Sequence, residues 1–291
     1  MYITITGELG SGKSTVAKLI SQKYDFMMYS TGVIQREIAK EKGMTTLELN
    51  QQMTNDIHNA YDKMIDDKTV ELAQKNMGKN IVFDSRMAWH FVEQSFKVYV
   101  TVDSYVAAER VILADRGKEE HYESIEEAAK SLRKRKQLED ARFAEMYSAK
   151  TTDFHNYDLV VDSTALTPEE LAEFIMENAK KEEKERQIFL SPLRLYPSQS
   201  VTVTEEEQEK ADGRIAVVEQ KGFYYIVNGH RQVCDALQKK KKLAAVSVLS
   251  VDTTGHVEMS DRTIDEIVNL SKQYYNEWEA YHGMKFLTYP D

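Results

Sequence analysis

Cysteine is almost absent from the 291-residue chain, in which Cys234 is the only one. A single cysteine excludes an intrachain disulfide and excludes zinc sites built from several cysteines. Long apolar runs are also missing, since no stretch reaches the roughly 20 residues that cross a bilayer. The first residues form a strand pattern, which is unlike a signal peptide. We therefore expect a cytoplasmic protein without a membrane partner.

Positive charge is in short supply as well. The chain has 38 Lys and Arg against 48 Asp and Glu, a formal net charge of −10. Because general nucleic-acid binders gain affinity from an excess of basic residues, this balance argues against DNA binding. Small anionic ligands need only local positive charge. With 42% hydrophobic residues, the chain has enough apolar side chains for buried cores, and its length allows two domains.

The most informative feature that is present is the segment Gly7–Ser14 (GELGSGKS), which fits the pattern G-x-x-x-x-G-K-[S/T]. A β-prone segment at 2–6 runs directly into it, and residues 15–20 continue with helical spacing. This order predicts a phosphate-binding loop for ATP, with Lys13 on the β- and γ-phosphates and Ser14 as a ligand of Mg²⁺. The residues predicted to bind ATP are Gly7, Gly10, Ser11, Gly12, Lys13, Ser14 and Thr15.

Strand-like and helix-like segments alternate through the first 165 residues. The expected strands cover 2–6, 80–84, 97–102 and 158–162. Such alternation predicts an α/β fold with a parallel sheet and helices on both faces. A helix expected to start near Thr167 runs to the charged stretch 180–186, which we interpret as a solvated helix end and linker.

The chain changes character after this stretch. Short β-prone pieces occur at 188–190, 216–218, 223–227 and 244–251, and 261–282 has the pattern of a closing helix. We therefore predict two domains, at 1–180 and 187–291, the second being smaller and α+β. The aromatic residues of the closing helix, among them Trp278, are expected to pack in the core or on a homodimer surface.

Hydroxyl residues follow the first predicted helix. Ser30 and Thr31 precede Gly32, and Arg36 lies one turn into the next helical segment. This set can hold a phosphate or a nucleotide base, while the alternative is a helix cap beside a surface arginine. 

Asp84 and Arg86 form a second candidate set at the carboxyl end of the strand predicted at 80–84. Open sheets of parallel strands bind their ligands at this end. Asp84 can hold the hydration shell of Mg²⁺, and Arg86 can grip the phosphate of an acceptor. The alternative for these two residues is a surface ion pair at a strand end. The predicted phosphate-binding loop beside them favours the ligand-binding interpretation.

A further arginine-rich segment surrounds residues 133–136. Arg135 and Arg142 are seven residues apart, so a helix would project them from nearly the same face. A mobile lid that carries arginines can neutralise the charge of a moving phosphoryl group and exclude water. The alternative is a solvated helix surface paired with acidic neighbours.

Together these motifs resemble the cytidylate kinases, most closely the short archaeal-type branch, over residues 1–165. The resemblance implies a P-loop nucleoside monophosphate kinase that uses ATP and Mg²⁺. By resemblance, Ser30, Thr31, Arg36 and Arg86 lie toward the monophosphate, and Arg135 and Arg142 serve the lid. Val33 and Ser85 depart from the branch, which often has an acidic residue and a glycine there.

The second half contains the segment 224–237 (YYIVNGHRQVCDAL), which resembles ParB/sulfiredoxin-like domains over residues 187–252. In several members of that group such a turn binds nucleotide phosphates. Gly229, His230 and Arg231 would form this second anion site, because backbone N–H groups at a helix start and a guanidinium attract anions. Gly229 replaces the cysteine that sulfiredoxin chemistry needs, so that activity is not expected.

The motifs predict phosphoryl transfer from ATP through Lys13, Arg135 and Arg142, and the resemblance implies a nucleoside monophosphate, CMP or dCMP, as the acceptor. The partners would be small nucleotides. Two alternatives stay open: a P-loop kinase with another small acceptor, and a nucleotide-sensing regulatory protein with little turnover.

Overall fold

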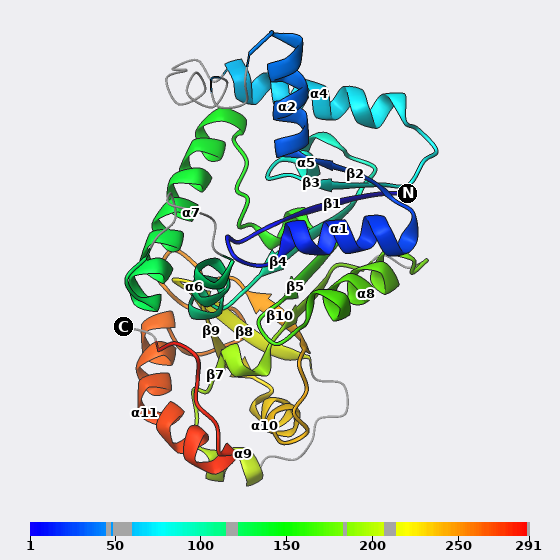
Figure 1. Cartoon of the computed structure of the whole chain (residues 1–291). Helices are drawn as coiled ribbons and strands as arrows, with labels where there is room; N and C mark the ends of the chain where they lie inside the picture. The colour runs from blue at the N-terminus through cyan, green and yellow to red at the C-terminus, as the bar shows by residue number, and fades with distance from the viewer. Residues whose placement is uncertain (45–47, 49–59, 115–121, 183–184, 207–213, 290–291) are drawn as a thin grey trace. The chain divides into compact units, whose positions relative to one another are not determined.

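The computed structural model describes residues 1–44, 48, 60–114, 122–182, 185–206 and 214–289 (Figure 1). The chain divides into two compact units. Unit 1 holds residues 1–101 and 133–186, and unit 2 holds residues 102–132 and 187–291. The predicted division into domains at 1–180 and 187–291 stays a prediction.

Unit 1 is built on a parallel sheet. In spatial order its strands are β2 (Met27–Ser30), β3 (Ile81–Asp84), β1 (Tyr2–Gly7), β4 (Phe96–Thr101) and β5 (Leu159–Asp162). Each neighbouring pair runs parallel, which confirms the expected α/β class. Strands β3, β4 and β5 are mostly buried and β1 is buried along its whole length, as expected for parallel strands that are covered on both faces.

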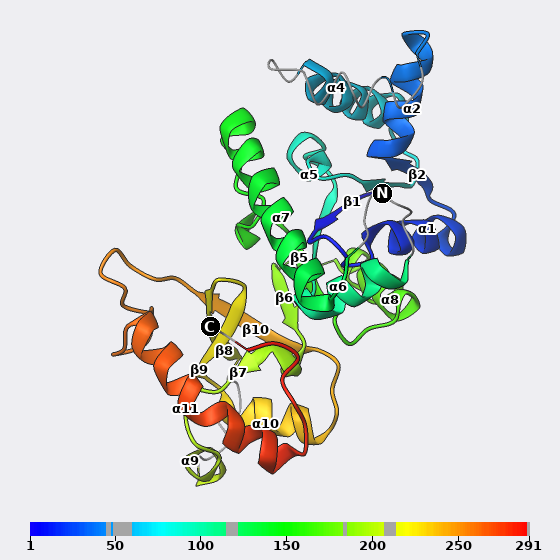
Figure 2. The same ribbon diagram turned by 60° about the vertical axis from the view of Figure 1, so that its left-hand side comes forward.

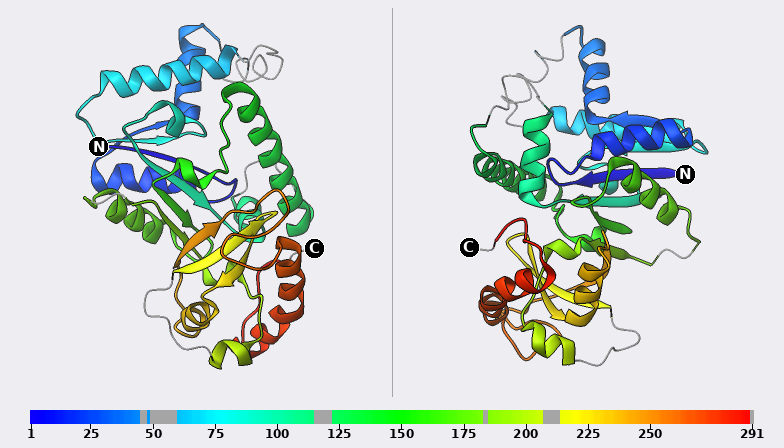
Figure 3. Two further views of the ribbon diagram at one scale, coloured as in Figure 1. Left: turned by 180° about the vertical axis from the view of Figure 1, so that it is seen from behind. Right: turned by 60° about the horizontal axis from the view of Figure 1, so that its bottom comes forward.

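Helices flank this sheet on two sides. The helices of unit 1 are α1 (Lys13–Tyr24), α2 (Thr31–Glu41), α4 (Ala60–Lys75), α5 (Ala88–Phe91), α8 (Pro168–Ala179) and, from residue 133 on, α7 (Ile125–Tyr147). Figures 2 and 3 show α1 and α8 alongside each other on one side of the strands, and Figure 2 shows α5 and α7 on the other. The expectation of helices on both faces is therefore confirmed for unit 1.

The ends of α8 follow from its sequence. Thr167 and Glu170 form a capping box, in which each side chain accepts a hydrogen bond from the other residue's backbone N–H. The helix ends at Ala179, so the charged stretch 180–186 follows the helix and is not its last turn. Residues 183 and 184 of that stretch lie outside the described part of the chain.

Unit 2 has a mixed sheet. In spatial order its strands are β6 (Gln187–Leu190), β10 (Ala244–Leu249), β8 (Ile215–Gln220), β9 (Phe223–Asn228) and β7 (Leu195–Tyr196). Its helices are α6 (Ser104–Leu113), the first turns of α7, α9 (Val201–Glu206), α10 (His230–Gln238) and α11 (Ile264–His282). Antiparallel pairs β6–β10 and β8–β9 flank the parallel pair β8–β10, so the expected α+β character is present.

The aromatic residues of α11 divide between core and surface. Trp278 is fully buried, and its Nε1 donates to the Gln199 carbonyl at 2.9 Å. Ile267 belongs to a core cluster with Tyr196, Tyr225 and Phe286. Tyr281, by contrast, is 45% exposed. The core interpretation therefore holds for Trp278, and the homodimer stays a prediction.

Candidate functional site

The loop between β1 and α1 depends on glycine at three positions. A Cβ on Gly7 would lie 2.1 Å from the Val100 carbonyl oxygen, so no side chain fits there. Gly10 and Gly12 have φ of 76° and 85°, in the left-handed region that favours glycine. The backbone N–H of Glu8 donates to the same Val100 carbonyl at 2.9 Å. These contacts give the loop a fixed seat at the carboxyl end of the sheet, as the motif predicts.

Lys13 begins α1 and lies over its own loop. Its Nζ donates to the Glu8 carbonyl at 2.5 Å and to Ser11 Oγ at 3.4 Å. Burial of the ammonium group, reinforced by the positive charge of Arg86, lowers the pKa of Lys13 to about 7. Asp84 and Glu139 oppose this shift, which shows that both carboxylates act on the same ammonium group.

Ser14 and Thr15 occupy the exposed first turn of α1. Asp84 ends β3, in register with Ile5 of β1 and Ser30 of β2. Mg²⁺ usually takes one or two protein oxygens and completes its shell with phosphates and water, so the Ser14 hydroxyl and the Asp84 carboxylate fit this ion. Among the described residues, no group of three or more His, Cys, Asp and Glu side chains forms a denser metal site.

The predicted acceptor side lies at the start of α2. Ser30 is the N-cap of this helix, and its Oγ accepts from the Val33 N–H at 3.3 Å. The guanidinium of Arg36 folds back over the same turn, since its Nη1 lies 3.7 Å from the place of a Cβ on Gly32. The cap and the grouping of Ser30, Thr31 and Arg36 are therefore both present, and their contact with a phosphate stays a prediction.

Arg86 links the acceptor side to the phosphate-binding loop. Its Nη1 donates to the Gly7 carbonyl at 3.1 Å, and its Nε lies 3.2 Å from Glu139 Oε2 of α7. In the described part of the chain, Arg86 pairs with Glu139 and not with Asp84, so the alternative of a surface ion pair between Asp84 and Arg86 is not observed. Instead, the arginine points across to β1 and α7, beside Lys13.

The α7 helix turns a different face to this site than the arginine spacing predicts. Arg135 and Arg142 are exposed, and Arg142 Nη1 lies 3.5 Å from Asp62 Oδ2 of α4. Lys136 and Glu139 lie on the less exposed side. Lys136 Nζ donates to Asp140 and, at 3.0 Å, to Thr151 Oγ1. The lid roles of the two arginines stay predictions.

Lys136 and Glu139 belong to the segment that the sequence marks as arginine-rich, but no role at the site was predicted for either residue. Both act on the ammonium group of Lys13, Lys136 lowering its pKa and Glu139 raising it. The signal was present in the sequence, because Leu132 and Phe143, both buried, share a helical stripe with 136 and 139. An apolar stripe marks the inward face more reliably than the spacing of two arginines.

The lowered pKa of Lys13 predicts that the protein takes up a proton when MgATP binds. At pH 8 a group with a pKa of about 7 is mostly neutral, and a bound triphosphate raises its pKa by charge attraction. Binding of MgATP at pH 8 should therefore take up most of one proton, and binding at pH 6 should take up much less. Calorimetry in two buffers of different ionisation enthalpy measures this uptake. Lys13→Met should abolish it, and equal heats in both buffers for the wild type would contradict it.

The second predicted anion site lies at the start of α10. Gly229 has φ of 91°, and a Cβ there would lie 3.0 Å from Ile215 Cα. Burial, with a smaller contribution from Arg262, lowers the pKa of His230 to about 3. Its Nε2 accepts from the Ser198 N–H at 3.1 Å, so the neutral ring holds the neighbouring loop. Arg231 Nε lies 3.6 Å from Asp235 Oδ1, one turn along.

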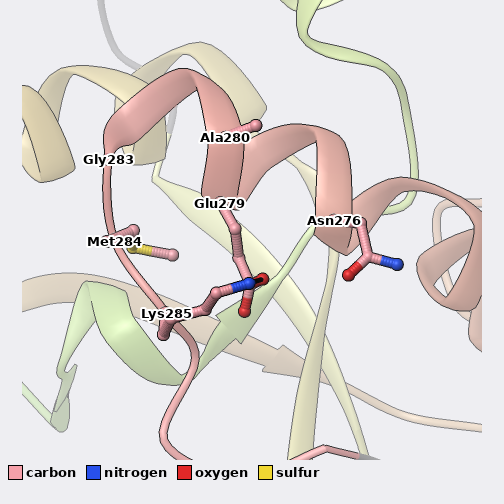
Figure 4. Close-up of a pocket in the computed structure, with 6 residues that line it drawn as sticks. All are labelled: Asn276, Glu279, Ala280, Gly283, Met284 and Lys285. Carbon is pink, nitrogen blue, oxygen red and sulfur yellow. Dashed lines mark hydrogen bonds and ion pairs between the residues drawn. The ribbon is translucent and has the colours of Figure 1, made fainter.

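A hollow of about 510 Å³ lies at the end of α11 (Figure 4). It is lined by Asn276, Glu279, Ala280, Gly283, Met284 and Lys285. Glu279 is almost fully buried, but its carboxylate already pairs with Lys285 and accepts from the Phe286 N–H at 3.0 Å. Tyr289 Oη donates to the same carboxylate. The Glu279 carboxylate therefore anchors residues 285–289 beside this hollow.

Comparison with known proteins adds independent findings. A model of the cytidylate kinase-like family matches residues 2–165. The cytidylate kinase of Methanococcus aeolicus is 33% identical over 165 residues, covering 57% of this chain and 89% of that protein. The shikimate kinase of Aquifex aeolicus aligns in structure over 61% of this chain and 95% of its own, with 18% identity and a TM-score of 0.41.

A third relative aligns over nearly the whole chain. It is an S-adenosylmethionine-dependent nucleotide dehydratase from Lacinutrix mariniflava, 28% identical over 272 residues, or 93% of this chain. The chain spans 53% of the length of that relative. None of the helices in the described ranges is long and apolar enough to span a membrane. The family match covers more than half of the chain, includes the phosphate-binding loop and Arg86, and confirms the resemblance seen in the sequence. The chain belongs to the cytidylate kinase-like family.

Proposed function

We propose that this chain transfers a phosphoryl group from ATP to a nucleoside monophosphate, CMP or dCMP. The observation that carries the proposal is the contact between Arg86 and Gly7. Through it, a guanidinium suited to an acceptor phosphate is joined to the loop suited to the donor phosphates. Lys13 lies close enough to Arg86 for the two charges to interact. Donor and acceptor phosphates can therefore meet between these two cations.

The chemistry needs no general base. A phosphate monoester has a second pKa of about 6, so the acceptor is largely a dianion at neutral pH and is already nucleophilic. Transfer then depends on holding the two phosphates in line and neutralising their charge. Lys13 would supply positive charge to the donor phosphates, and Arg86 would supply it to the acceptor phosphate. Mg²⁺, held by Ser14 and Asp84, would add charge to the donor phosphates when bound.

The relatives support a nucleotide as the acceptor more firmly than they support cytosine. One relative named above is a cytidylate kinase and another is a nucleotide dehydratase. Val33 and Ser85, where the archaeal-type branch often has other residues, lie beside Ser30 and Arg86. We therefore propose phosphoryl transfer to a nucleoside monophosphate as the general function. As a second, more specific proposal, the acceptor is CMP or dCMP.

An acceptor screen tests both levels of this proposal. The purified full chain is given MgATP and each ribo- and deoxyribonucleoside monophosphate in turn, with ADP release and the product diphosphate measured together. CMP or dCMP should give the highest kcat/KM. A higher kcat/KM for another nucleoside monophosphate would reject the specific acceptor. ADP release without any phosphorylated product would reject the kinase.

We propose for unit 2 a ParB/sulfiredoxin-like domain that binds a nucleotide at residues 228–231. The described unit supports this with a left-handed Gly229, a helix start and the guanidinium of Arg231. The alignment with the dehydratase relative also extends through this unit, so the two units occur together in another nucleotide-processing protein. Because unit 2 includes residues 102–132, the fragment 187–291 lacks part of it, and the test requires the full chain.

Arg231→Ala tests this second site. In a chain that also carries Lys13→Ala, we expect CTP or ADP to bind with micromolar affinity and Arg231→Ala to weaken that binding about tenfold or more, because charged hydrogen bonds to phosphate are strong. Lys221→Ala, at the exposed turn before β9, is the matched control. A folded double variant without measurable nucleotide binding would leave unit 2 with a purely structural role.

A further inference from the structure

Arg86 is held through both its main chain and its side chain. Its backbone carbonyl accepts from Thr6 Oγ1 at 3.1 Å and from Trp89 Nε1 at 3.0 Å. Its guanidinium donates from Nη1 to the Gly7 carbonyl and faces Glu139 with Nε. Three of these four contacts come from β1 and α5, which are fixed in the core of unit 1. Glu139 is the only charged partner among them.

The pair between Arg86 and Glu139 is largely removed from water. The two side chains are 30% and 20% exposed. A carboxylate in such a place loses hydration, and this cost is offset only by a well-placed cation. Glu145 shows the contrast, because it lies on the same helix and is exposed. The helix therefore directs one particular carboxylate toward the arginine.

This pairing leaves one end of the guanidinium available. Within the described part of the chain, no hydrogen-bond partner is found at Nη2 of Arg86. A guanidinium binds phosphate best when its planar fork is fixed and its free N–H groups point at the oxygens. With Nε held by Glu139 and Nη1 by Gly7, rotation of the guanidinium plane is restricted. The acceptor phosphate would then meet a donor that is already oriented.

We propose that Glu139 is a positioning residue for phosphoryl transfer, which fixes Arg86 so that its Nη2 edge faces the acceptor phosphate. This inference rests on the proposed kinase function. Glu139 does not touch the reacting atoms and exchanges no proton with them. Its contribution is orientation, which counts because small errors in the placement of reacting groups cost rate.

Steady-state kinetics on the full chain tests the role. With MgATP and the acceptor found in the screen, Glu139→Ala should raise the KM for the acceptor about fivefold to tenfold and leave the KM for ATP within about twofold. The KM for the acceptor in Glu139→Gln should lie between those of the wild type and Glu139→Ala, because the amide oxygen still accepts a hydrogen bond from Nε of Arg86. In an Arg86→Ala background, Glu139→Ala should not raise the KM for the acceptor any further, since the group that it positions is gone.

Controls separate orientation from folding and from competition. Glu145→Ala, on the same helix, should leave all kinetic constants unchanged. Thermal unfolding checks that each variant is folded. If Glu139→Ala does not fold, Glu139→Gln is used in its place. An unchanged KM for the acceptor, or equal losses in the Arg86→Ala background, would overturn the positioning role. A lower KM would overturn it too, because Glu139 would then compete with the phosphate. A wild type that phosphorylates no acceptor would instead reject the kinase function on which the role rests.

Discussion

Lys13→Ala should abolish phosphoryl transfer while the protein stays folded. Removing a cation that faces charge developing in a transition state typically costs about 10²- to 10³-fold in kcat. Within the residues that the structure describes, the Nζ of Lys13 donates to the Glu8 carbonyl and to Ser11 Oγ of its own loop, and to no carboxylate. Burial lowers the pKa of Lys13, which means that the folded protein disfavours the charged form of this side chain. Removing the side chain should therefore cost little free energy of unfolding. The loss should therefore fall on kcat and not on the melting temperature.

Two companion variants make this result specific. Lys18→Ala removes an exposed lysine from the same helix and should leave kcat unchanged. Lys13→Arg keeps the charge but replaces a compact ammonium by a larger planar group, so it should also lose most of the activity. ADP release and circular dichroism, measured on the same preparations, decide the outcome. A folded Lys13→Ala protein with turnover near that of the wild type would reject the kinase function.

Much of unit 1 could be predicted because its signals are local. The strands 2–6, 80–84 and 158–162 are apolar runs between helical patterns, and each was placed to within one residue of the observed strand. Strand β2 was missed, since Met27–Ser30 contains no β-branched residue and its first residue is exposed. Strand β7 is only two residues long and carries no periodic signal.

The site was predictable only where it lies within one segment. The phosphate-binding loop and the end of β3 are each continuous in sequence, so their residues could be named in advance. The pairing of Arg86 with Glu139 depends on how α7 is rotated, which is set by the burial of Leu132 and Phe143. The spacing of Arg135 and Arg142 identifies two residues on the exposed face of α7. Charged residues do not show which face of a helix is buried, because the apolar residues determine that.

Arg86→Ala should raise the KM for the monophosphate far more than the KM for ATP. The guanidinium follows β3 and reaches the carboxyl edge of the sheet, where it can bind an acceptor phosphate through two N–H groups. Loss of such a charged contact costs a factor of about 10 to 100 in binding. Bisubstrate kinetics, with each substrate varied at saturating levels of the other, measures the two constants separately. Lys79→Ala, before the opposite end of β3, is the matched control.

The effect on ATP has a definite sign because Arg86 also acts on Lys13. The positive charge of Arg86 lowers the pKa of Lys13, so its removal should raise that pKa and leave more of the ammonium charged at pH 8. The KM for ATP in Arg86→Ala should therefore stay the same or fall slightly at pH 8, while proton uptake on MgATP binding decreases. Arg86→Lys should retain the effect on Lys13 and still lose acceptor affinity, since an ammonium cannot form the planar fork. Equal increases in both Michaelis constants, or an increase for ATP alone, would show that Arg86 serves the donor phosphates instead.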